Sequence, residues 1–145
     1  MADQSKKPLD VLLVEDSPTQ AQLVQLIASE VDDFNLIHHA EDGDEALVYL
    51  REDGAKRPDL VLLDINMPKM DGFEVLKEMK ADKDLCKIPV VMLTTSSAEE
   101  DIVKSYQDGA STFMSKPLEL QKLKEILEQF AAYWSQAAKL PNADS

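Results

Sequence analysis

Cysteine and long hydrophobic runs are nearly absent from this chain. The 145 residues include one cysteine, Cys86, which cannot form an internal disulfide bond. No apolar stretch approaches the roughly 20 residues that a helix needs to span a bilayer. The lysines at positions 6 and 7 are not followed by the long apolar segment of a secretory signal. These absences predict a cytoplasmic protein whose core forms without disulfide bonds.

Basic residues and glycines are also scarce. Lysine and arginine total 15 against 28 aspartates and glutamates, which gives a net charge of -13. This balance argues against direct binding to nucleic acid, because such binding usually depends on a concentrated basic surface. No glycine- and serine-rich linker, low-complexity tract or internal repeat divides the chain. We therefore expect one domain over residues 1–138, a short tail over residues 139–145, and no attached DNA-binding output domain.

Short apolar runs alternate with helical patterns along the whole chain. Strands are predicted at residues 11–14, 35–39, 60–63, 90–93 and 112–114. Helices are predicted at residues 18–31, 44–51, 73–80, 98–107 and 119–136. The central strands are apolar on both faces, as in a parallel sheet that is covered by helices on each side. The pattern therefore predicts an α/β protein with the architecture of a three-layer sandwich.

The first helix has a recognisable start. Ser17 can cap it, and Pro18 suits its first turn. Gln20 lies where the side chain of a capping box returns to the cap residue. We expect this helix to run to about Val31.

Polar side chains lie at the C-terminal ends of the predicted strands. Glu15 and Asp16, then Asp64, Thr94 and Lys116, each end an apolar run or follow it closely. Because the carboxyl ends of parallel strands meet at one edge of a sheet, we expect these side chains to share a crevice. The carboxylates alone would repel one another, so a hard divalent cation, Mg2+, is expected among them. Each residue alone would be an ordinary turn or cap residue, but their joint spacing argues for a site.

Four short motifs resemble the receiver domain of two-component response regulators. They are Val-Glu-Asp at residues 14–16, Leu-Asp-Ile-Asn-Met-Pro-Lys-Met-Asp-Gly at 63–72, Leu-Thr-Thr at 93–95 and Ser-Lys-Pro at 115–117. The intervals from Asp64 to Thr94 and to Lys116 also agree with the family pattern. The resemblance covers nearly the whole chain. It implies a flavodoxin-like, five-stranded parallel sheet of order 2-1-3-4-5 with five helices.

The resemblance assigns the central chemistry to Asp64. Its carboxylate would attack the phosphorus of a phosphohistidine on a sensor histidine kinase or a phosphotransfer protein, and would become an aspartyl phosphate. Mg2+ would be held by Asp16, Asp64 and the backbone carbonyl of Asn66, with Glu15 acting mostly through water. The family often has aspartate where this chain has Glu15. Because only slow self-dephosphorylation would follow, the chain is predicted to be a signalling domain rather than an enzyme.

The same resemblance implies a switch beside the phosphoacceptor. Lys116 and Thr94 would each contact a phosphoryl oxygen, and a cis bond between Lys116 and Pro117 would direct the lysine into the crevice. Phe113 occupies the position of the family's switch aromatic, although an aromatic strand residue also suits a simple core position. The altered surface would comprise residues 98–107, residues 112–114 and the last helix, and it would signal to a downstream protein.

The last helix carries an apolar stripe that has two interpretations. Its members are Leu123, Ile126, Leu127, Phe130, Ala131 and Trp134, with Tyr133 beside them. The stripe recurs at helical spacing, and it either packs on the sheet or leaves part of its surface for a homodimer or a docking partner. Residues 93–106 and 130–134 resemble small stand-alone regulators that partner phytochrome-type histidine kinases and are often dimers. A light-sensing pathway is therefore the first expectation.

Two other functions fit parts of the sequence. A Mg2+-dependent phosphohydrolase would also use Asp64 as nucleophile, but Asn66 stands where phosphatases of the haloacid-dehalogenase type usually have a second aspartate as general acid. A phosphorylation-independent binding module on the same fold is the other alternative.

His38 and His39 point to opposite faces of a predicted strand, and neither has a cysteine or further histidine at ligand spacing. We expect neither histidine to bind a metal.

Overall fold

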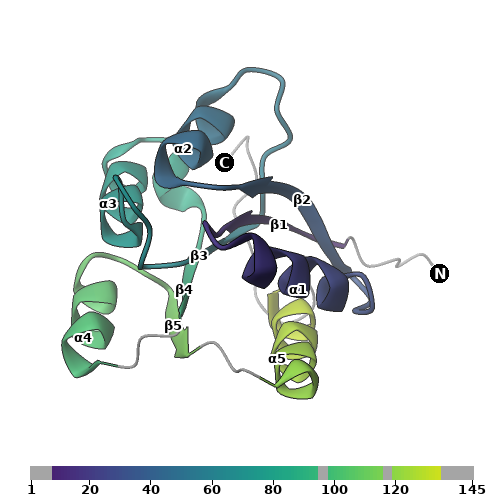
Figure 1. Ribbon diagram of the computed structural model, residues 1–145. Coiled ribbons are helices and arrows are strands. Elements are labelled where there is room, and N and C mark those ends of the chain that lie inside the picture. The colour runs from purple at the N-terminus through teal and green to yellow at the C-terminus, as the bar shows by residue number, and fades with distance from the viewer. Residues whose placement is uncertain (1–7, 95–97, 116–118, 135–145) are drawn as a thin grey trace.

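The computed structural model describes residues 8–94, 98–115 and 119–134. Within these ranges, five parallel strands form one sheet in the order β2-β1-β3-β4-β5, with helices on both faces (Figure 1). The strands are β1 (Leu9–Val14), β2 (Phe34–Ala40), β3 (Leu60–Leu63), β4 (Val90–Thr94) and β5 (Thr112–Ser115). The helices are α1 (Pro18–Ala28), α2 (Gly43–Arg51), α3 (Gly72–Ala81), α4 (Glu99–Gln107) and α5 (Leu120–Ala132), with a short 3-10 helix, η1 (Leu85–Lys87), before β4. The predicted sandwich and the strand order are confirmed.

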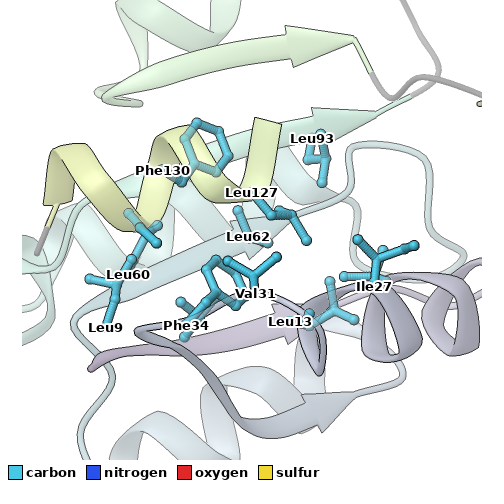
Figure 2. Packing of buried hydrophobic residues seen from close by; sticks show 14 of the residues in the cluster. Leu9, Leu13, Ile27, Val31, Phe34, Leu60, Leu62, Leu93, Leu127 and Phe130 are labelled. Atoms are coloured by element: carbon cyan, nitrogen blue, oxygen red, sulfur yellow. The ribbon is translucent and has the colours of Figure 1, made fainter. Parts of the chain in front are cut away.

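The side chains of β1 alternate between two hydrophobic clusters. Leu9, Val11 and Leu13 belong to the cluster beneath α1 and α5. Leu12 and Val14 belong to the cluster beneath α2 and α3. This division follows from the two-residue period of a strand. Figure 2 shows the first cluster, in which side chains of α1, α5 and the sheet meet. Both faces of β1 are therefore covered, as the apolar strand sequences predicted.

The apolar stripe of α5 packs on the sheet and on α1. Its buried members are Leu123, Leu127, Phe130 and Ala131, and Ile126 and Trp134 pack against the same cluster. Packing on the sheet therefore accounts for the stripe itself. Leu120 and Tyr133 lie outside the stripe, with 49% and 55% of their surface exposed.

The helix α1 is shorter than predicted, because it ends at Ala28 and not at Val31. The N–H of Glu30 donates to the carbonyl of Ile27 at 3.0 Å, and the N–H of Val31 donates to the carbonyl of Ala28 at 3.1 Å. These tighter turns take the chain out of the helix. The side chain of Val31 remains buried in the cluster beneath α1 and α5, so it continues the hydrophobic pattern without continuing the helix.

Among the residues that the structure describes, no helix has both the length and the apolar character that a membrane span needs.

Asp82 supports the connection from α3 to β4. Its Oδ1 accepts the N–H groups of Asp84 at 2.8 Å and Leu85 at 3.1 Å. The bonds from Leu85 and Asp84 hold the pKa of Asp82 below its usual range. A carboxylate whose pKa is lowered by folding stabilises the folded state above its unfolded pKa, and this contribution is lost as the pH falls through the folded pKa.

We expect Asp82→Ala to lower the free energy of unfolding by no more than about 1 kcal/mol at neutral pH, because the side chain is partly exposed to water. The difference from the wild type should shrink as the pH falls below the usual aspartate pKa of about 3.9 and then through the lowered pKa of Asp82 in the folded protein. Urea denaturation at several pH values measures this dependence. Asp82→Asn, which keeps an acceptor oxygen without the charge, should lose less stability. A difference that stays constant over the whole pH range would contradict this role of the carboxylate.

Candidate metal centre

Three carboxylates meet where β1 and β3 end. The two strands pair in parallel through Val14 and Leu63, and the N–H of Asp64 donates to the carbonyl of Val14 at 3.1 Å. This pairing brings together Glu15, Asp16 and Asp64, with one carboxylate oxygen of each residue within 4.8 Å of the others. The structure thus places side by side three residues that were predicted from the sequence to share a site.

The carboxylate cluster is largely removed from solvent. Glu15 is 1% exposed and Asp64 is 8% exposed, while Asp16 is half-buried. Ionised carboxylates at this separation are unfavourable in a buried place unless a cation or hydrogen bonds offset their charge. Carboxylate oxygens are also the ligands that hard divalent cations prefer. The donor set therefore fits Mg2+ or a chemically similar ion.

The start of α1 orients the side chain of Glu15. The hydroxyl of Ser17 accepts the N–H of Gln20 at 3.3 Å, and Pro18 occupies the first turn, which confirms the predicted cap. The N–H of Ser17 donates to Oε2 of Glu15 at 3.2 Å, where the capping box had predicted the side chain of Gln20. The carboxylate of Glu15 is therefore held by the turn that directly follows β1.

Gly72, the first residue of α3, packs closely on the backbone of Asp64. The N–H of Gly72 donates to the carbonyl of Ile65 at 2.9 Å. A Cβ at Gly72 would collide with the backbone oxygen of Asp64 and would lie 2.9 Å from Cα of Ile65. The N–H of Asn66 donates to Oδ1 of Asp64 at 3.4 Å, and the predicted ligand role of the Asn66 carbonyl stays a prediction. The close approach of Gly72 was not predicted, because it exists only once the loop has folded back.

The strands β4 and β5 end at the same edge of the sheet as β1 and β3. Thr94 is the last residue of β4, and it pairs with Ser115 at the end of β5. The backbone therefore places Thr94 at the predicted edge. Lys116 and Pro117, with the predicted cis bond between them, lie outside the described residues.

Phe113 lies in β5 opposite Met92 of β4. It is half-buried and packs against the cluster beneath α2 and α3. Its N–H donates to the hydroxyl of Tyr106 in α4 at 3.1 Å. These contacts fit a core position as well as a switch position, so the switch role stays a prediction. The contact with Tyr106 joins α4 to β5, and a tyrosine in an amphipathic helix carries no sequence signal of such a contact.

A parallel sheet of this order, with a buried carboxylate cluster at its C-terminal edge, defines a receiver domain of the response regulators. The family model for the response regulator receiver domain matches residues 11–128, so the chain belongs to this family. The response regulator Rcp1 of Synechocystis sp. is 39% identical over 148 residues, which cover 99% of this chain and 100% of that protein. The chain is therefore a response regulator that resembles Rcp1.

Two solved structures are similar over almost the whole described fold. The phosphorylated cyanobacterial phytochrome response regulator RcpA has a TM-score of 0.84 and 39% identity, with 93% of this chain and 99% of that chain covered. The Mn2+-bound form of Rcp1 has a TM-score of 0.81 and 38% identity, with 93% of this chain and 100% of that chain covered. These likenesses confirm the predicted family, and one of the two relatives was seen with a divalent metal.

Proposed function

We propose that Asp64 accepts a phosphoryl group from a phosphohistidine of a sensor histidine kinase or a phosphotransfer protein. One carboxylate oxygen of Asp64 attacks the phosphorus, and the bond from phosphorus to the histidine nitrogen breaks. The histidine leaves with the bonding electrons, and an aspartyl phosphate remains on this chain. The observation that carries the proposal is the buried cluster in which Asp64 lies beside the carboxylates of Glu15 and Asp16.

Mg2+ is the cofactor that we propose for this centre. Asp16, Asp64 and the backbone carbonyl of Asn66 would hold it, and Glu15 would act mostly through water. Bound there, the ion would offset the negative charges of the attacking carboxylate and of the phosphoryl group. The oxygen donor set of the cluster and the Mn2+-bound relative both support a divalent ion. The bond from Ser17 N–H to Glu15 keeps that carboxylate turned toward the start of α1.

In this proposal, Thr94 and Lys116 detect the phosphorylated state. The hydroxyl of Thr94 would donate to one phosphoryl oxygen, and the ammonium of Lys116 would contact another. Phe113 would then change its packing as Thr94 moves toward the new charge. Two observations support this coupling: Thr94 and Phe113 lie on neighbouring strands, and the backbone of Phe113 is bonded to Tyr106 of α4.

The output surface that we propose is the face formed by α4, β5 and α5. The exposed large apolar residues of α4 and α5, and of the position directly after α5, are Val103, Tyr106, Leu120 and Tyr133. A surface of this kind would bind a downstream protein or a second copy of the chain. Hydrolysis of the aspartyl phosphate would be slow, so the chain would act as a signalling component and not as an enzyme.

The similarity to a phytochrome response regulator supports a light-sensing pathway. We propose that residues 1–138 form the receiver domain and that a phytochrome-type histidine kinase in the cytoplasm is its phosphodonor. The charge of -13 continues to argue against nucleic acid as a direct partner.

Incubation with acetyl phosphate tests the proposed function. In the presence of Mg2+, the intact mass should increase by one phosphoryl group, and chelation of the metal should prevent this increase. A sizing column then shows whether phosphorylation produces a dimer. Rapid consumption of acetyl phosphate without a gain in mass would favour the phosphohydrolase. Neither consumption nor a gain in mass would favour the phosphorylation-independent binding module.

A further inference from the structure

The imidazole of His39 contacts the backbone of the carboxylate cluster. Its Nε2 lies 2.8 Å from the carbonyl oxygen of Glu15. Because a carbonyl oxygen can only accept a hydrogen bond, Nε2 of His39 must carry the proton and donate it. This carbonyl belongs to the peptide group that joins Glu15 to Asp16. His39 thereby acts on the link between the two cluster residues that follow β1.

The contact lies where the backbone pairing of β1 and β2 stops. The register of these strands ends at Val14 and Ala40, and the N–H of Glu15 still donates to the carbonyl of Ala40 at 3.0 Å. Beyond Ala40 the chain leaves β2 and enters the cap of α2. The side chain of His39 contacts the carbonyl of Glu15 there. His39 and Asp16 also line the same small pocket between α1 and β2. The peptide between Glu15 and Asp16 is thus held from the β2 side by a side-chain donor.

His38 provides an internal comparison. Its ring stacks on Tyr49 of α2 with the ring centroids 4.3 Å apart, and its Nε2 lies 3.7 Å from a carboxylate oxygen of Glu45. The two histidines are adjacent in sequence, but their rings lie on opposite faces of β2, as predicted from the period of a strand. A change at His38 therefore alters the same strand without touching the carboxylate cluster.

We propose that His39 is a positioning residue for the metal centre. By fixing the peptide between Glu15 and Asp16, it holds their carboxylates at the separation that suits a divalent ion. Removal of a hydrogen-bonding group that orients metal ligands typically weakens metal affinity by about 10- to 100-fold. The inference rests on the proposed metal site, and it concerns metal affinity before any phosphoryl transfer takes place.

Isothermal titration calorimetry of the unphosphorylated protein with Mg2+ tests the role of His39. We expect His39→Leu to bind Mg2+ at least about tenfold more weakly than the wild type. His39→Gln, whose side-chain amide can donate from nearly the position of Nε2, should recover most of the affinity. His38→Leu should bind as the wild type does. Thermal unfolding without Mg2+ is measured for each variant, so that a change in affinity is separated from a change in stability.

Three results would overturn the proposal. They are wild-type affinity in His39→Leu, a loss that His39→Gln does not recover, and an equal loss in His38→Leu. If His39→Leu does not fold, His39→Gln is compared with the shorter His39→Asn: weaker binding by the asparagine variant supports the proposal, and equal binding contradicts it. A wild type that binds no Mg2+ would overturn the proposed metal site together with this inference, whereas equal binding by wild type and variant overturns the inference alone.

Discussion

Asp64→Asn should accept no phosphoryl group from acetyl phosphate under conditions that label the wild-type protein. The amide has nearly the shape of the carboxylate, but it is not a nucleophile toward phosphorus, so the aspartyl phosphate cannot form. The substitution also removes one of three neighbouring carboxylates and relieves their repulsion. The metal-free variant should therefore unfold at a higher urea concentration than the metal-free wild type. Intact mass spectrometry and urea denaturation measure the two effects.

Asp71→Asn is the matched control for this experiment. Asp64 and Asp71 both lie in the segment between β3 and α3. The Oδ1 of Asp71 accepts the N–H of Glu74 at 3.0 Å and caps α3. Asparagine caps helices about as well as aspartate, so this variant should fold and should be phosphorylated as the wild type is. Phosphoryl incorporation into Asp64→Asn would place the acceptor on another residue and would remove the basis of the proposed function.

Gly72→Ala should lower the free energy of unfolding by about 1–3 kcal/mol. The added methyl group would collide with the backbone oxygen of Asp64 and approach Cα of Ile65, so the loop after β3 would have to move. Because Asp64 would move with this loop, the affinity for Mg2+ should fall as well. Urea denaturation followed by circular dichroism measures the first effect, and calorimetric titration measures the second.

Gly54→Ala separates backbone strain from crowding at the site. Gly54 has a φ of 87°, which disfavours alanine, but a Cβ there would meet nothing within 4 Å. This variant should lose about 1 kcal/mol of stability and keep the wild-type affinity for Mg2+. Two results would contradict this role of Gly72. One is an equal loss of Mg2+ affinity in both glycine variants, and the other is a Gly72→Ala variant with the wild-type stability and Mg2+ affinity.

The carboxylate cluster was predictable because its residues are tied to the ends of strands. An apolar run such as residues 60–63 marks a strand, and parallel strands deliver the residues at their C-terminal ends to a common edge. Glu15, Asp16 and Asp64 therefore needed only the order of the strands to come together. The helix cap at Ser17 was predictable for a similar reason, since capping depends on residues that are close in sequence.

Contacts that depend on register or packing were not predictable. The approach of His39 to Glu15 depends on the pairing of β1 with β2, whose register shifts between Val11 and Leu12. Such a shift by one residue changes which side chain faces a given neighbour. Gly72 shows its steric role only after the loop has closed on Asp64. The end of α1 was missed because Val31 is buried whether or not the helix continues, so its hydrophobicity carries no information about the backbone.

The strand order places the chemistry and the proposed output on parts of the sheet that differ in rigidity. β1 and β3 are interior strands that are hydrogen-bonded on both sides, and their residues are buried throughout. β5 is an edge strand with three partly buried residues and an exposed Ser115. Backbone amides of interior strands exchange with solvent mainly through global unfolding, whereas edge strands open in local fluctuations. We therefore expect the strands that carry the carboxylate cluster to be strongly protected from exchange, and β5, which belongs to the proposed output surface, to open more readily.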